Sequence, residues 1–170
     1  MAIIKVGNQG FSGTKGITMA DAFRKTVGST FTALTNTTIT GWERVDTEFS
    51  QIGTGLTESS GVFTFPQTGI YFISFSGTFS DTQNVRYVGN HLHVSTDGGS
   101  NFEVRSYGYQ AIPYVSSTWY SSHHQTHILD VTDISNFQFK WVINPEVNMT
   151  VSGNTSNRRT GFEIFRIGDT

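Results

Sequence analysis

The clearest periodic pattern in the chain lies in residues 70–79, where large and small side chains alternate. One side of a strand with this pattern carries Tyr71, Ile73, Phe75, Gly77 and Phe79. Burying each large apolar side chain is worth roughly 1.5–3 kcal/mol, so we expect this side to face the core. The other side begins with Ile70 and Phe72 and then becomes small and polar. Since a purely solvent-facing side would not need Phe72, we expect a partner surface to cover part of it.

Similar β-type runs recur along the chain and are separated by turn sequences. Pro66 and Gly69 mark one turn, and residues 97–100 mark the clearest hairpin turn. The expected strands cover residues 31–34, 42–52, 62–65, 70–79, 86–95, 102–109, 118–131, 137–143 and 161–167. Short strands with turns at regular spacing predict an all-β antiparallel sandwich.

The first residues differ from this pattern, and we interpret residues 1–28 as an N-terminal arm on a domain of residues 29–170. Glycines interrupt any long element in the arm. Residues 3–6 are a candidate edge strand, and residues 20–25 follow a weak capping box and are a candidate helical turn. The arm carries apolar residues that need a neighbour to cover them, among them Ile3, Ile4, Val6 and Phe11. We therefore expect an anchoring arm, with a flexible leader as the alternative.

Composition narrows the classes of function. Charged residues make up 14% of the 170 residues and the net charge is −2, so no basic surface for a nucleic acid is expected. The chain has no cysteine, which excludes disulfides and cysteine zinc sites. No stretch reaches the length of a membrane span, and the N-terminal apolar run is too short for a signal peptide. We expect a protein made in the cytoplasm, with neither a nucleic acid nor a membrane as partner.

Residues 61–66, 69–72 and 161–165 resemble the C1q/tumour-necrosis-factor superfamily, and residues 129–141 are similar to its penultimate strand pair. The resemblance covers about residues 31–167 and implies a jelly roll. The chain lacks the collagen stalk and the cysteines of animal members of this superfamily. Its short sequence, rich in Ser, Thr, Gly and Asn around a C1q-like core, resembles bacteriophage virion proteins.

The same resemblance implies a compact homotrimer, packed around a threefold axis through one sheet. The implied interface residues are Phe72, Ser74, Ile128, Phe165 and Ile167. On the last strand, Phe162 and Ile164 would face the core of the sandwich instead. The alternative is a monomer in which the same residues belong to an ordinary core.

Sites for chemistry are weakly indicated. Residues 95–102 nearly match an Asp-box, but a single box is more typical of a hairpin turn closed by Asp97 than of a glycan hydrolase. No G-x-S-x-G elbow accompanies the serines and histidines, so we expect neither an enzyme nor a cofactor. Among five histidines, His124 on a threefold axis is a weak candidate ligand for zinc or nickel. The alternative is that the histidines lie at the surface or are hydrogen-bonded.

Aromatic residues gather around one predicted loop: Tyr107, Tyr109, Tyr114, Trp119 and Tyr120. Sugars stack on such rings, and protein partners use them as well. This stretch is therefore a candidate surface for a host glycan or a receptor.

Three functions remain open. The leading hypothesis is a non-enzymatic virion structural protein: a trimeric capsid decoration protein on the particle surface, made in the host cytoplasm. Its arm would contact other virion proteins, such as the major capsid protein. The second hypothesis is a receptor- or glycan-binding tip that uses the aromatic residues. The third, a glycan hydrolase, is indicated only by the Asp-box.

Overall fold

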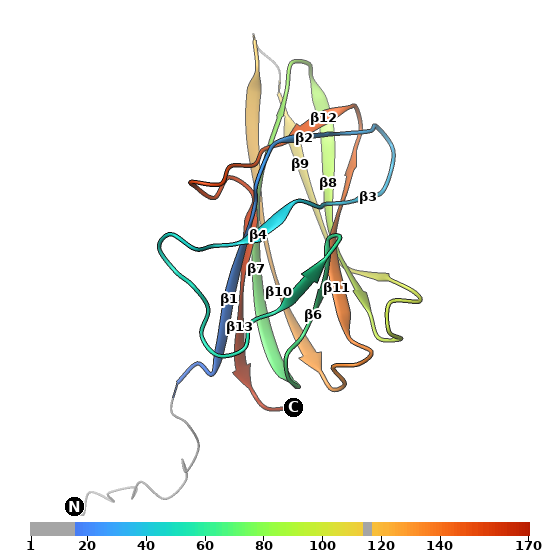
Figure 1. Ribbon diagram of the computed structural model, residues 1–170. Coiled ribbons are helices and arrows are strands. Elements are labelled where there is room, and N and C mark those ends of the chain that lie inside the picture. The colour runs from blue at the N-terminus through green and yellow to red at the C-terminus, as the bar shows by residue number, and fades with distance from the viewer. Residues whose placement is uncertain (1–15, 114–116) are drawn as a thin grey trace, which may run out of the picture.

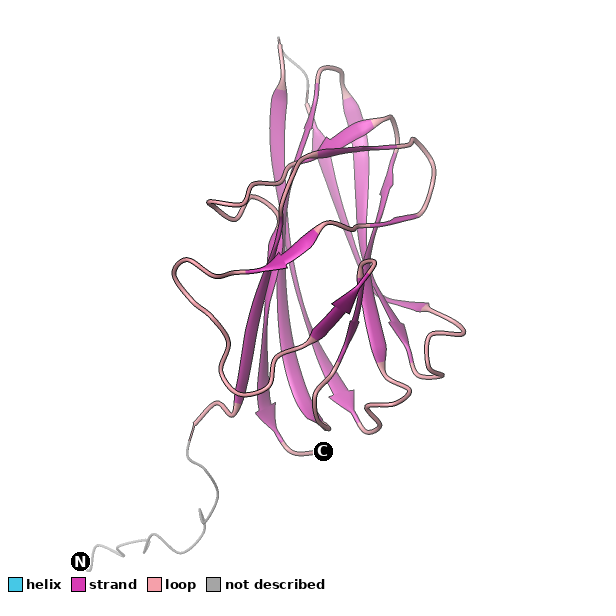
Figure 2. Cartoon of the chain, viewed as in Figure 1, coloured by secondary structure: helices cyan, strands magenta, loops and turns pink. Residues whose placement is uncertain are grey.

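The computed structural model describes residues 16–113 and 117–170, which form two antiparallel sheets packed face to face (Figure 1). Figure 2 shows strands and loops but no helix in these residues, so none of them forms a helix that could cross a membrane. The strands are β1 Met19–Lys25, β2 Ser29–Phe31, β3 Thr37–Thr38, β4 Trp42–Arg44, β5 Thr57–Ser59, β6 Val62–Thr64, β7 Gly69–Asp81, β8 Val85–Ser95, β9 Glu103–Ile112, β10 Trp119–Val131, β11 Gln138–Pro145, β12 Met149–Val151 and β13 Gly161–Gly168. The predicted all-β sandwich is confirmed.

The strand order is that of a jelly roll. In the first sheet the order is β2-β12-β7-β13-β1-β4. β12 and β13 pair with successive parts of one edge of β7, and β10 pairs with the opposite edge. In the second sheet the order is β5-β6-β11-β8-β9, and β3 also pairs with β11. Strands β9 and β10 are therefore edge strands of different sheets, although they follow each other in the sequence.

The core lies between the two sheets and is rich in aromatic rings. The predicted inward residues are all 0% exposed: Tyr71, Ile73, Phe75, Phe79, Phe162 and Ile164. At one end of the core, Phe63 of the second sheet packs against Phe23 and Phe162 of the first, with ring centroids 5.1 and 4.9 Å away. The period-two pattern of β7 and β13 thus identified the buried face correctly.

Residues 19–25 are a strand and not the helical turn that the capping pattern predicts. β1 pairs with β13 along one edge and with β4 along the other, and every residue of it is buried. Pairing on both edges outweighs a weak local preference for helix. The boundary after residue 28 is therefore corrected, because β1 belongs to the jelly roll and any arm ends before it. The predicted anchor residues Ile3, Ile4, Val6 and Phe11 lie outside the described residues.

Charged side chains of β1 are buried and paired. The carboxylate of Asp21 accepts hydrogen bonds from the guanidinium of Arg44 at 2.9 Å and from the backbone N–H of Leu56 at 2.8 Å. Arg24, 3% exposed, donates to Glu43 at 2.6 Å. These bonds fasten β1 to the segment that contains β4 and the loop after it.

The predicted strand 42–52 is mostly a loop. Only Trp42–Arg44 forms a strand, and the chain then returns to β1 through a bridge between Ile52 and Ala20. Phe49 and Ile52 are 37% and 43% exposed, so the apolar residues of this segment do not share one buried face. β12, in contrast, lies in residues 144–160, where the sequence pattern predicts no strand. Its alternation of buried and half-buried residues spans only three residues, which is too short to predict a strand.

Candidate interaction surfaces

An apolar row crosses the outward face of the first sheet. The register places Ile128 of β10 opposite Phe72 of β7, and Phe72 opposite Phe165 of β13. Phe165 in turn lies opposite Ala20 of β1. Ile128 is 59% exposed, whereas Phe72 and Phe165 are half-buried. Since side chains opposite one another in a ladder share a face, three of the predicted interface residues form one line.

The other two predicted interface residues lie beside this row. Ser74 is two positions from Phe72 on the same side of β7, and Ile167 is 56% exposed near the end of β13, where the register shifts. Next to Ser74 the face becomes polar, because the Nε2 atom of His124 lies 3.4 Å from the Ser74 hydroxyl. The outward face of the first sheet is thus apolar along the row that contains Phe72 and polar beside Ser74.

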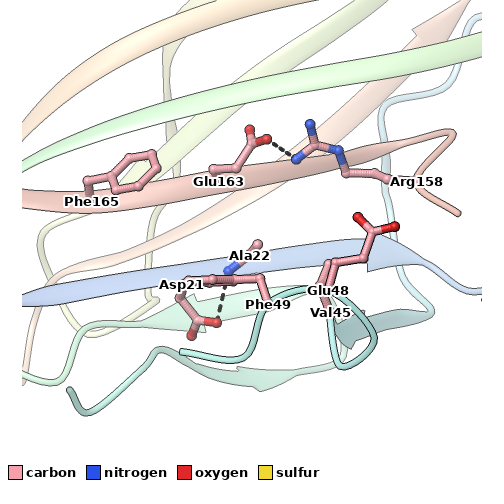
Figure 3. A pocket seen from close by; sticks show the side chains of 8 residues that line it. All are labelled: Asp21, Ala22, Val45, Glu48, Phe49, Arg158, Glu163 and Phe165. Carbon is pink, nitrogen blue, oxygen red and sulfur yellow. Dashed lines mark hydrogen bonds and ion pairs between the residues drawn. The ribbon is translucent and has the colours of Figure 1, made fainter. Parts of the chain in front are cut away.

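A cavity of about 510 Å³ opens next to the apolar row (Figure 3). Its lining residues are Asp21, Ala22, Val45, Glu48, Phe49, Arg158, Glu163 and Phe165. Phe165 and Phe49 contribute apolar surface, and Arg158 forms an ion pair with Glu163. Because Phe165 belongs to both features, the cavity extends the apolar row toward the loop after β4.

A second surface lies on the outward face of the second sheet, and we call Tyr87, His91, Tyr107 and Tyr109 the tyrosine surface. His91 of β8 lies opposite Tyr107 of β9, with ring centroids 4.7 Å apart. The rings of Tyr107 and Tyr109 are parallel within 7° and 6.2 Å apart. Beside them is a cavity of about 500 Å³, lined by Asn36, Tyr87, His91, Val104, Tyr107, Tyr109 and Asn144.

The five aromatic residues singled out from the sequence do not form one surface. Tyr107 and Tyr109 belong to the tyrosine surface, whereas Tyr120 is 62% exposed on β10 of the first sheet. Trp119 packs against the core, and Tyr114 lies outside the described residues. The separation arises because β9 and β10 are consecutive in sequence but belong to different sheets.

Two polar residues beside the tyrosine surface, Asn36 and Asn144, were not predicted from the sequence. The side-chain amide of Asn144 donates to the side-chain oxygen of Asn36 at 2.8 Å, across 108 positions of sequence. The Nε2 atom of His91 is buried and has no hydrogen-bond partner within the described chain. The alternation of residues 86–95 predicts His91 and His93 on one strand face, but no local signal brings Asn36 and Asn144 together.

The single Asp-box is a turn device. The carboxylate of Asp97 accepts hydrogen bonds from the backbone N–H of Asn101 at 2.9 Å and from the Ser95 hydroxyl at 2.7 Å. Bonds from Asn101 and then from Ser95 lower the pKa of Asp97 to about 2. Since these bonds close the hairpin between β8 and β9, they support the structural interpretation of this motif over the catalytic one.

The histidines occupy different environments. His91 and His93 stack on β8 with ring centroids 6.1 Å apart, and His123 and His127 alternate with the exposed His124 on β10. Burial lowers the pKa of His91, His123 and His127. For His93, burial and then the neighbouring His91 lower the pKa to about 4. No group of three or more metal-binding side chains occurs among the described residues, and a threefold His124 site stays a prediction.

We expect the protein to lose stability as the pH falls from about 7 to about 5. The unfolded chain takes up protons at its histidines near pH 6.5, whereas the folded chain resists protonation of His93 until about pH 4. The unfolded state then binds more protons, so the free energy of unfolding decreases as the pH falls. Thermal melts at pH 7.5 and pH 5.0 measure the effect.

His93→Gln serves as the control, because it removes the titrating group and should reduce the difference between the two melting temperatures. The carboxylate of Asp97, with a pKa of about 2, does not interfere in this window, since its contribution is lost only at lower pH. Equal melting temperatures of the unmodified protein at both pH values would contradict the prediction.

The chain matches no protein-family model, and no curated protein is similar to it in sequence. Solved structures, in contrast, share its fold. The structure of murine APRIL at pH 5.0 has a TM-score of 0.64 at 14% sequence identity, over 88% of this chain and 98% of that one. Eiger TNF from S. frugiperda has a TM-score of 0.64 at 10% identity, over 89% of this chain and 93% of that one. The described chain therefore has a TNF-like jelly-roll fold.

Proposed function

We propose that this protein is a non-enzymatic structural protein that assembles as a homotrimer through the outward face of its first sheet. The observation that carries the proposal is the apolar row formed by Ile128, Phe72 and Phe165. Exposed apolar residues that lie singly need no explanation, but a continuous row on one sheet is typical of an association surface. The TNF-like fold supports a trimer, since the superfamily that the sequence resembles packs around a threefold axis through one sheet.

The geometry also favours assembly over chemistry on this face. The adjacent cavity of about 510 Å³ continues the apolar row at Phe165, so a neighbouring chain can insert a side chain beside that ring. Two carboxylates of the cavity lining are already paired within the chain, Glu163 with Arg158 and Asp21 with Arg44. Among the described lining residues, the uncompensated charge that a partner would cover is that of Glu48.

Within this function, a capsid decoration protein on the surface of a bacteriophage particle is the specific role that we propose. Its support is the sequence character of a short chain rich in Ser, Thr, Gly and Asn around a C1q-like core. The described chain enters β1 at Met19, which pairs with Arg166 near the end of β13. Residues before β1 thus start from one end of the sandwich, where they can reach another virion protein such as the major capsid protein.

Phe165→Asp should convert the trimer into a folded monomer. The substitution places a carboxylate in the apolar row and next to Glu163, whose partner Arg158 is already paired, so a contacting subunit would bury it without a counter-ion. We expect association to weaken by at least about 100-fold, as a cost of about 3 kcal/mol implies. Sedimentation equilibrium at micromolar concentration measures the change.

Leu34→Asp is the matched control. Leu34 is 70% exposed outside the first-sheet ladder, with a φ of 56° that aspartate tolerates, so this variant should remain trimeric. An unmodified protein that sediments as a monomer at every concentration would overturn the trimer.

The virion role is tested separately with particles that lack the protein. The full chain should add to such particles, and a chain that begins at Gly16 should form trimers without adding to them. If the shorter trimer binds the particles as tightly as the full chain, the anchoring role of the N-terminal residues is wrong. If neither binds, the decoration role is wrong while the trimer stands.

A further inference from the structure

The tyrosine surface has the form of a binding site rather than of a scattered set of rings. Tyr107 and Tyr109 are 61% and 57% exposed, so large parts of both rings face solvent. They are parallel within 7°, and His91 meets Tyr107 edge to face, at 66° between the ring planes. The neighbouring cavity of about 500 Å³ lies within the range of roughly 300–1,000 Å³ that is usual for ligand pockets.

The floor of this site depends on a glycine. Gly89 of β8 lies opposite Tyr109, and a Cβ atom added there would come within 2.7 Å of His91 Nε2 and 3.1 Å of the Tyr109 ring. The absence of a side chain at Gly89 therefore lets the imidazole and the phenol ring lie close to the backbone of the sheet. A larger residue would fill this part of the site.

An unpartnered polar group borders the same space. His91 is only 5% exposed, and its Nε2 atom has no hydrogen-bond partner within the described residues, although the residue lines the cavity. A buried nitrogen of this kind costs free energy unless water or a ligand satisfies it. Burial lowers the pKa of His91, so its imidazole is neutral at pH 7 and can act as either donor or acceptor.

The other polar groups of the lining suit hydroxyl-rich molecules. The amides of Asn36 and Asn144 share one hydrogen bond, and each amide has further donors or acceptors beyond that bond. The lining residues include no carboxylate, lysine or arginine, which disfavours charged ligands. Tyrosine rings have a negative face that attracts the polarised C–H groups of a pyranose, and their hydroxyls can bond sugar hydroxyls.

We propose that the tyrosine surface, together with Asn36 and Asn144, binds a neutral oligosaccharide. A sugar ring stacks on Tyr107, and its hydroxyl groups bond the two amides and the Nε2 atom of His91. The site lies on the second sheet and is independent of the proposed association face on the first, so the inference holds whether the protein is a monomer or a trimer.

The test uses the full chain on an array of neutral oligosaccharides built from glucose, galactose, mannose and their N-acetyl derivatives. We expect binding to at least one member, which is then titrated in solution by calorimetry. Tyr107→Ala should weaken that binding by about tenfold or more, because it removes one stacking platform. Gly89→Ala should weaken it as well while every ring is retained.

Tyr120→Ala is the matched control, since Tyr120 is equally exposed at 62% but belongs to the first sheet. It should leave the affinity unchanged, and thermal melts should show that Tyr107→Ala is folded. The proposal is overturned if no neutral oligosaccharide on the array binds. It is also overturned if Tyr107→Ala binds as tightly as the unmodified protein, or if Tyr120→Ala loses as much affinity.

Discussion

A chain that begins at Ser29 should fail to fold, whereas a chain that begins at Gly16 should keep the sandwich. The first deletion removes β1, which pairs with β13 on one edge and with β4 on the other. It also removes Phe23, whose ring packs against Phe63 and Phe162 in the core. Truncation of a single buried aromatic residue typically costs about 3–5 kcal/mol, so loss of the whole strand should exceed the usual stability of a domain.

Circular dichroism and thermal melts of the two shortened chains measure the difference. The chain from Gly16 retains every described strand and is the control for loss of the preceding residues. A cooperative melt of the Ser29 chain near the temperature of the full chain would contradict the prediction, and would restore the boundary first expected from the sequence.

The misinterpretation of β1 has a physical cause. Pattern analysis treats charged residues as exposed, yet Asp21, Arg24 and Lys25 are 1%, 3% and 2% exposed. Each has a partner from a segment distant in sequence; Lys25, for example, donates to the backbone carbonyl of Thr40 at 2.8 Å. With these residues counted as polar, alternation disappears and a weak capping box decides the interpretation. Residues 70–79 of β7 contain no charged residue, so nothing disturbs the pattern there, and the alternation predicts the buried face correctly.

The two surfaces differ in how far the sequence predicts them. Phe72 and Phe165 could be placed on one face because their strands alternate regularly, and the ladder then brings Ile128 into the same row. The tyrosine surface needs the register of β8 with β9, which includes shifts near both ends of the ladder. It also needs the contact of Asn36 with Asn144, which only the folded chain creates.

The apolar row and the tyrosine surface belong to opposite sheets, so one can be covered while the other stays exposed. A trimer that uses the outward face of the first sheet leaves the outward face of the second sheet free. Each particle-bound trimer would then present three copies of the tyrosine surface. Three weak sites on one trimer could bind a glycan-coated surface at the same time. The trimer should therefore bind such a surface more tightly than a single site binds one oligosaccharide.

Tyr71→Ala should destabilise the protein by about 3–5 kcal/mol, the usual cost of truncating a large buried aromatic residue. Tyr71 is 0% exposed, and its ring lies 4.8 Å from that of Phe65. Its hydroxyl donates to the backbone carbonyl of Gln67 at 2.8 Å, and burial raises the pKa of Tyr71, so the phenol stays protonated as a donor. Chemical denaturation at pH 7.5 measures the free energy of unfolding.

Tyr71→Phe separates the two contributions to this loss. It keeps the ring and removes only the hydrogen bond to Gln67, so it should cost about 0.5–1.5 kcal/mol. The difference between the two variants reports the packing of the ring between β7 and the turn before it. If Tyr71→Ala and Tyr71→Phe were equally destabilising, the ring would contribute nothing beyond its hydroxyl, and the assignment of Tyr71 to the core would be wrong.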